Sequence, residues 1–106
     1  MSGDAHELRR TFGERLAALY GPSLRAVLLY GSYARGDFDS ESDFDVLVVL
    51  DGFDRYGAEV DRTAEIASEL SLQYGVSISQ MFLRETEWLS GDSPFLRNVR
   101  KEAVPA

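Results

Sequence analysis

Apolar residues recur at helical spacing in two long stretches of the chain. Such spacing puts apolar side chains on one face of a helix, which a glycine or proline then ends. The first stretch stops at Gly21-Pro22 and the second at Gly75, so we predict two amphipathic helices. Asp4 and Glu7 have the spacing of a capping pair for the first helix. The apolar positions are Leu8, Phe12, Leu16 and Leu19 in the first helix and, within residues 59–74, Val60, Ile66, Ala67, Leu70 and Tyr74 in the second.

Three shorter stretches have the patterns of β-strands. Residues 26–30 form an apolar run that ends before a glycine, and residues 44–50 contain the β-branched-rich run VLVV. Residues 76–83 alternate imperfectly between two faces, with Ile78 and Phe82 on one of them. We therefore predict one strand in each stretch.

A short C-terminal helix follows the third predicted strand. Ser93-Pro94 has the sequence of an N-cap with proline at the first helical position. The order helix, strand, strand, helix, strand, helix predicts an α+β fold, an α/β sandwich with helices packed on a small three-stranded mixed sheet. Because 106 residues is the usual size of one domain, we predict a single domain over residues 1–106.

The charge of the chain is acidic and concentrated. Lys and Arg number 11 against 18 Asp and Glu, which gives a formal net charge of −7. Local acidity is typical of a cation site, and a chain without excess positive charge is not expected to bind nucleic acid directly. The acids that dominate the charge lie close together: Asp37, Asp39, Glu41, Asp43 and Asp45.

Cysteine content and hydropathy exclude further classes of protein. The chain has no cysteine, which excludes thiolate zinc sites and cysteine nucleophiles. No apolar run approaches the length that spans a bilayer, and the polar N-terminus lacks the apolar core of a signal peptide. We therefore expect a cytoplasmic protein that makes no contact with a membrane.

Asp43 and Asp45 stand two residues apart at the second predicted strand, so their carboxylates point to one face. Two hard oxygen ligands on a rigid face suit Mg²⁺, which also keeps water and substrate phosphates as ligands. Without a cation, the two negative charges repel and raise each other's pKa. The alternatives are that the pair keeps an edge strand soluble or only forms the polar end of a strand.

Gly31-Ser32 follows the first predicted strand and is a candidate phosphate site. A glycine at such a turn lets backbone N–H groups approach a phosphate, and the serine hydroxyl adds a donor. Arg35, three residues beyond Ser32, can neutralise the same anion. The alternatives are a plain tight turn and, for Arg35, a surface salt bridge to Asp37 or Asp39.

Both candidate sites lie in the segment GSYARGDFDSESDFDVLVV. This segment resembles the G-S-x10-D-x-D signature of the DNA polymerase beta-like nucleotidyltransferase superfamily. It contains Gly31-Ser32, then ten intervening residues, then Asp43 and Asp45. The G-S-x-A-R-G opening and the FLRNVRKE ending look like the minimal nucleotidyltransferases of bacteria and archaea, which are often paired with HEPN-domain proteins in toxin–antitoxin modules.

The resemblance implies a nucleotidyltransferase fold and an activity. In the superfamily, the residues matching Asp43 and Asp45 are catalytic and bind divalent metal, usually Mg²⁺, which bridges the nucleotide triphosphate. Those matching Gly31 and Ser32 hold its phosphates. The expected reaction transfers a nucleoside monophosphate, AMP from ATP, to an acceptor hydroxyl on a HEPN-type toxin, with this chain as the antitoxin.

Two other functions remain open at this point. The first is a non-catalytic antitoxin that occludes a HEPN partner and keeps a weak or vestigial site. The second is a nucleotidyltransferase that modifies small molecules, which the lack of an acceptor lobe disfavours. A small catalytic core has little surface with which to select an acceptor, so we expect specificity to come from a partner or a second copy of the chain. The helical face with Phe95, Leu96 and Val99 is a candidate contact unless it packs on the sheet.

The candidate metal site departs from the superfamily pattern at one position. Many members carry a third carboxylate on the next core strand, whereas residues 76–83 contain no Asp or Glu. Aligned by the start of the strand, Ser79 occupies the place of that acid. Glu85 and Glu87 follow the strand, either as substitutes or as solvated charges.

Overall fold

A computed structural model describes residues 5–106 of the chain. The expected cap Asp4 lies outside the described residues. In chain order, the elements are α1 (Ala5–Tyr20), the 3-10 turn η1 (Gly21–Ser23), β1 (Leu24–Tyr30), α2 (Ser32–Arg35), β2 (Phe44–Leu50), α3 (Tyr56–Tyr74), β3 (Ile78–Arg84), α4 (Glu85–Ser90), α5 (Pro94–Glu102) and β4 (Val104–Pro105).

The strands form one mixed sheet in the order β3-β2-β1-β4. β1 pairs antiparallel with β2 and β4, whereas β2 and β3 run parallel. The predicted α+β class is confirmed, with one correction: the sheet has four strands instead of three. The additional strand, β4, has only two residues, which pair with Leu28 and Leu29, and a pattern needs more positions than that to be recognised.

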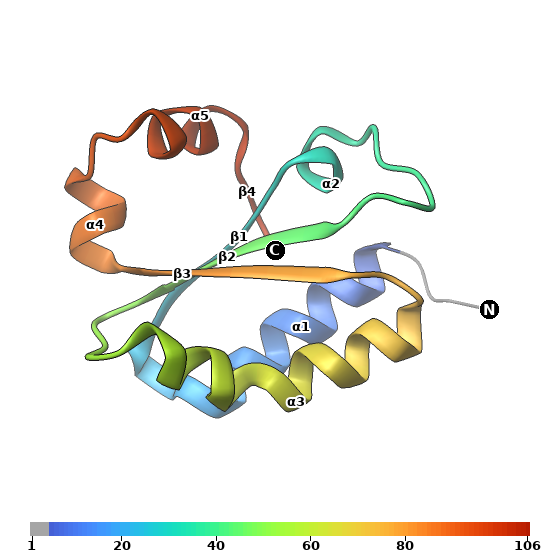
Figure 1. Ribbon diagram of the computed structural model, residues 1–106, viewed down its shortest axis with the longest axis horizontal. Coiled ribbons are helices and arrows are strands. Elements are labelled where there is room, and N and C mark those ends of the chain that lie inside the picture. Colours follow the sequence, from blue (N-terminus) through green and yellow to red (C-terminus); the bar gives the residue numbers. More distant parts are fainter. Residues whose placement is uncertain (1–4) are drawn as a thin grey trace.

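Helices cover both faces of the sheet. α1 and α3 lie below it in Figure 1, whereas α2, α4 and α5 lie above it. Alternate residues of β2 therefore enter two separate cores: Val46 and Val48 pack with α1 and α3, and Leu47 and Val49 pack with Val99 of α5. This two-sided burial explains why the strand reads as a continuous apolar run.

The lower core corrects the predicted helical faces at two positions. In α1, the predicted apolar position Leu19 is 41% exposed, and Tyr20 is buried in its stead. In α3, Val60 is 42% exposed while Glu59 and Thr63 are buried. These polar side chains tolerate burial because the Tyr20 hydroxyl donates to Glu59 Oε1 over 2.8 Å and the Thr63 hydroxyl donates to the Glu59 carbonyl over 2.9 Å.

The upper helices place the C-terminal segment over the sheet. As predicted, Ser93 caps α5: its hydroxyl accepts a hydrogen bond from Leu96 N over 3.1 Å. Leu96 and Val99 are buried, so this face packs in the fold and is not free for a partner. Phe95 remains 38% exposed and lies edge-on to Tyr30, with ring centroids 5.7 Å apart.

Two short helices were not anticipated, because each is too short to show a period. α2 follows β1 directly, and α4 follows β3. Among residues 5–106, no helix is both long and apolar enough to cross a membrane.

Candidate active site

The turn after β1 has a backbone conformation that requires glycine. Gly31 has φ 75° and ψ −155°, a combination that residues with a Cβ atom rarely adopt. A Cβ atom at this position would lie 2.5 Å from Oδ2 of Asp45. The absence of a side chain therefore lets the Asp45 carboxylate lie directly against the turn that begins α2.

The two candidate metal ligands sit at the start of β2. Phe44, fully buried against α1, anchors the strand and points into the lower core. Asp43 and Asp45, one residue to either side, belong to the opposite face by the alternation of a strand. Asp43 is exposed and Asp45 is half-buried, on the same face of the sheet as α5.

The electrostatics of Asp45 indicate negative charge that the protein itself does not neutralise. Burial raises the pKa of Asp45, and the nearby carboxylates of Asp43 and Glu102 raise this pKa further. Arg35 acts in the opposite direction with a smaller effect on the same pKa. The net direction is upward, as expected for carboxylates gathered to receive a cation.

The acidic loop between α2 and β2 is held by its own contacts. Tyr33 stacks on Phe38, with ring centroids 4.1 Å apart and an interplanar angle of 6°. Asp39 Oδ1 accepts a hydrogen bond from Glu41 N over 2.9 Å, and Asp39 N donates to the Ser42 hydroxyl over 2.9 Å. These contacts order the loop that connects the candidate phosphate-binding residues to Asp43.

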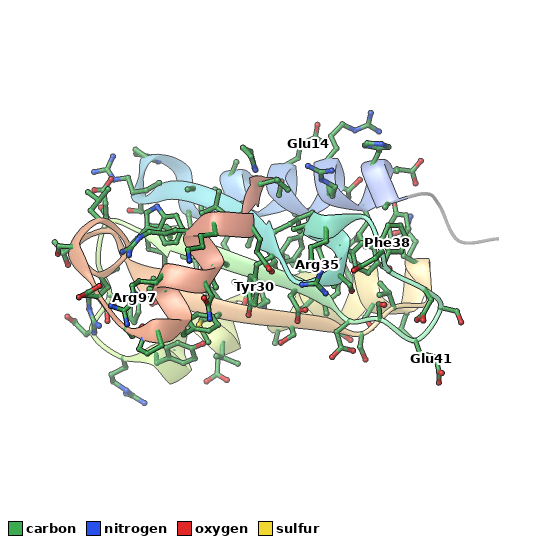
Figure 2. The ribbon with its side chains drawn as sticks, turned by 90° about the horizontal axis from the view of Figure 1, so that it is seen from above. Glu14, Tyr30, Arg35, Phe38, Glu41 and Arg97 are labelled. Carbon is green, nitrogen blue, oxygen red and sulfur yellow. The ribbon has the colours of Figure 1, made fainter. Side chains whose placement is uncertain are left out.

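Arg35 lies beside the Gly31 turn in two ion pairs. Its guanidinium is 3.2 Å from Asp37 Oδ2 and 3.4 Å from Glu102 Oε1, and its side chain is half exposed. Figure 2 shows Arg35 beside α5 on the upper side of the sheet, with Phe38 and then Glu41 on the loop beyond it. The structure thus brings Gly31, Arg35 and Asp45 together, with Ser32 as the first residue of α2.

Sequence reasoning missed Glu102, the last residue of α5. Gly31 N donates a hydrogen bond to Glu102 Oε2 over 2.5 Å, across 71 positions of the chain. The available signal was its spacing: Glu102 stands three residues after the buried Val99 and so lies on the helix face that meets the sheet. The sequence alone does not show which part of the sheet that face covers.

The place of the missing third acid is occupied by a hydroxyl. In the parallel pairing of β2 with β3, the Cα partner of Asp45 is Ser79. Glu85 and Glu87 begin α4 at the opposite end of β3, where they pair with Arg25 and Arg84. They are therefore surface ion-pair residues and not substitutes for the acid.

The donor set fits a Mg²⁺ that is shared with a substrate. Among residues 5–106, no group of three or more His, Cys, Asp or Glu side chains is arranged to hold a metal alone. Asp43 and Asp45 supply hard carboxylate oxygens on one face, and Mg²⁺ commonly takes one or two carboxylates with the rest of its ligands from water and phosphates.

The nucleotidyltransferase domain family matches residues 9–106, which include every candidate residue of this site. The chain belongs to this family. It is therefore a nucleotidyltransferase enzyme, as its resemblance to the superfamily implied.

Two relatives come from Methanocaldococcus jannaschii. One, named "Putative protein adenylyltransferase MJ0141", is 36% identical over 80 residues, which cover 76% of this chain and 80% of the relative. The other has the same name with the designation MJ0604, and is 32% identical over 99 residues, 88% of each chain. Their similarity extends across most of this nucleotidyltransferase domain.

Solved structures confirm the nucleotidyltransferase fold. A toxin–antitoxin crystal structure with AMP-PNP has a TM-score of 0.64 at 19% identity, covering 89% of this chain and 68% of that one. A variant of the toxin–antitoxin MntA–HpeT has a TM-score of 0.58 at 20% identity, covering 86% of this chain and 66% of that one. At identities of 19% and 20%, the similarity shows a shared fold and nothing more.

Proposed function

We propose that this nucleotidyltransferase transfers AMP from ATP to an acceptor hydroxyl, with Mg²⁺ held by Asp43 and Asp45. The observation that carries the proposal is the contact between the Asp45 carboxylate and the Gly31 turn, which puts a metal ligand next to candidate phosphate donors. The relatives named as protein adenylyltransferases support AMP as the transferred group and a protein as the acceptor.

In this reaction, the acceptor hydroxyl loses its proton to solvent water and its oxygen forms a bond to the α-phosphorus, while the bond from the α-phosphorus to the β-phosphate oxygen breaks and pyrophosphate leaves. Bound Mg²⁺ neutralises charge on the phosphates, the main requirement of such a transfer. Gly31 N–H and the Ser32 hydroxyl donate hydrogen bonds to phosphate oxygens, and Arg35 adds a positive charge. Asp43 and Asp45 hold the metal on the rigid start of β2.

We further propose a toxin of the HEPN class as the protein acceptor, with the cytoplasm as the location. The support is the fold shared with chains from toxin–antitoxin crystal structures and the similarity of the FLRNVRKE ending to minimal nucleotidyltransferases. Of the three apolar residues of α5 that were candidate contacts for such a partner, Phe95 is the exposed one, since Leu96 and Val99 are buried.

A second candidate function rests on Ser79. Because the acid expected beside Asp45 is replaced by a hydroxyl, the site has fewer metal ligands than many superfamily members. An antitoxin that neutralises its partner by occlusion needs no catalysis and tolerates this loss.

The test is to incubate the purified protein with ATP, Mg²⁺ and the product of the neighbouring gene, and to measure intact masses. We expect a gain of one AMP on the partner with the native chain and none with the double variant Asp43→Asn/Asp45→Asn. The matched control is Asp61→Asn/Glu65→Gln, which removes two exposed charges from α3. A stable complex without an adduct would favour occlusion and overturn the catalytic proposal.

A further inference from the structure

The Glu102 carboxylate accepts hydrogen bonds from two donors that lie beside the candidate metal site. Glu102 Oε2 accepts from Gly31 N over 2.5 Å, and the same carboxylate lies 3.4–3.5 Å from Arg35 Nη1. Both donors come from the turn and short helix after β1, whereas Glu102 comes from the end of α5.

The Glu102 carboxylate thus binds the donors in the way that a phosphate group would. A backbone N–H at a glycine turn and a neighbouring guanidinium are donors that bind phosphate and carboxylate oxygens alike. The Glu102 carboxylate is also close enough to Asp45 to raise the pKa of that residue. It therefore binds the proposed phosphate donors close to Asp45, a proposed metal ligand.

We propose that Glu102 is an internal competitor for the nucleotide's phosphate groups and so sets the affinity of the site for Mg²⁺-bound ATP. This inference rests on the proposed function, because it assigns Gly31 and Arg35 to the same phosphates. Binding of the nucleotide displaces the Glu102 carboxylate from Gly31 N–H and from Arg35. The apparent dissociation constant is raised in inverse proportion to the fraction of time that the site is free of Glu102.

The fold allows this exchange without rearrangement of α5. Val99 anchors the helix in the upper core, Ala103 N caps it by donating to the Val99 carbonyl, and β4 continues as an edge strand on β1. The Glu102 side chain, by contrast, is 30% exposed and stands on the last turn. Rotation about its own side-chain bonds is enough to release Gly31 and Arg35.

The opposite role, in which Glu102 replaces the missing third metal ligand, predicts the opposite result. A metal ligand strengthens binding of Mg²⁺-bound ATP, whereas a competitor weakens it. The hydrogen bond from Gly31 N favours competition, since a carboxylate already bound to an N–H donor and a guanidinium has its charge directed toward those donors.

The test is calorimetric titration of the full chain with ATP in excess Mg²⁺. Glu102→Gln removes the charge and keeps an oxygen that can accept from Gly31, whereas Glu102→Ala removes both. Glu65→Gln, an exposed position on α3, is the matched charge control. We expect the dissociation constant to fall about threefold for Glu102→Gln and about tenfold for Glu102→Ala, with the control unchanged.

Two further readouts separate competition from a general structural effect. In transfer assays with the partner, Glu102→Ala should lower KM for ATP with little change in kcat, the pattern of altered substrate binding. The Gly31 amide resonance should move on addition of Mg²⁺-bound ATP in the native chain and should already be displaced in Glu102→Ala.

The results distinguish failure of this inference from failure of the proposed function. If the native chain binds Mg²⁺-bound ATP and both Glu102 variants bind it equally or more weakly, Glu102 is not a competitor and only the inference is overturned. If neither the native chain nor any variant binds Mg²⁺-bound ATP, the proposed function is overturned together with it.

Discussion

At Gly31, the smallest residue makes room for the most important contact of the candidate site. Its φ of 75° and the position of Asp45 Oδ2, 2.5 Å from a Cβ placed on it, are two independent reasons for glycine. The same residue donates its N–H to Glu102. The proposed metal ligand, phosphate donor and competitor thus all meet at one backbone position.

Gly31→Ala should therefore impair both stability and transfer. The added methyl group displaces the Asp45 carboxylate, and the backbone strain should lower the free energy of unfolding by about 1–3 kcal/mol. Gly13→Ala is the control: nothing lies within 4 Å of that Cβ position in α1, so the substitution should stabilise the helix by up to about 1 kcal/mol. Urea unfolding measures both, and equal effects of the two substitutions would contradict this account of the turn.

Asp45→Asn should stabilise the metal-free protein at neutral pH. Because the pKa of Asp45 is raised in the folded state, the native chain holds this proton more tightly than the unfolded chain. Its stability therefore falls as pH rises through the usual Asp pKa toward the raised one, and the uncharged variant avoids this loss.

The difference is measured by thermal unfolding in the presence of a chelator. At about pH 7 the variant should be more stable by a few tenths of a kcal/mol, since the site is partly exposed, and at about pH 3 the two proteins should converge. A native chain that is the more stable of the two at neutral pH without metal would contradict the charge repulsion.

At the scale of elements, periodicity predicted most of the helices and strands, but not the details of their faces. Apolar spacing and stop residues predicted α1 and α3, the Ser93-Pro94 cap predicted α5, and apolar runs or alternation predicted the three long strands. The burial of Glu59 was not predictable, because it depends on the hydroxyl of Tyr20, which is far away in sequence. The G-S-x10-D-x-D spacing placed Gly31 and Asp45 in one candidate site, and the two residues do lie together, because β1 and β2 pair with Tyr30 opposite Asp45.

Glu102 could not be predicted in the same way. Its position against Gly31 depends on where α5 crosses the sheet, which packing across the whole chain decides. The spacing from Val99 places Glu102 on the buried face of α5, but it does not tell which residues of the sheet that face contacts.

Tyr20→Phe should loosen the packing of α1 against α3. The variant leaves the Glu59 carboxylate, 6% exposed, without the hydroxyl that donates to it, which should cost about 1–3 kcal/mol of unfolding free energy. Tyr74→Phe is a matched control on the same helices, because its partner Glu7 is exposed and can bind water. Chemical denaturation should show the larger loss for Tyr20→Phe, and the reverse order would contradict a buried role for Glu59.

At the scale of the whole molecule, the lower face of the sheet holds the larger core, and the upper face carries a smaller core and the candidate site. α1 and α3 close the lower face, whereas α5 covers only part of the upper face (Figure 1). The acidic start of β2 lies near the end of α5, where we propose that a nucleotide and the acceptor of a partner bind. This division lets a small chain keep a core and an open site together.

Mg²⁺ and ATP together should therefore stabilise the whole fold through this upper face. At a nucleotide concentration one hundred times the dissociation constant, the gain should be about 2.7 kcal/mol, measured as a rise in the melting temperature. The Asp43→Asn/Asp45→Asn variant should show almost none of this rise, while Asp61→Asn/Glu65→Gln should retain it. An equal rise in all three proteins would place the nucleotide elsewhere.

The central claim is that the site transfers the nucleotidyl group and not another part of ATP. The most direct measurement incubates the native chain and its partner with Mg²⁺ and ATP labelled in either the α- or the γ-phosphate, and follows the label on protein. Our account predicts stable labelling of the partner from the α-phosphate alone, lost in Asp43→Asn/Asp45→Asn. Label from the γ-phosphate, or α-label that persists in that variant, would contradict it.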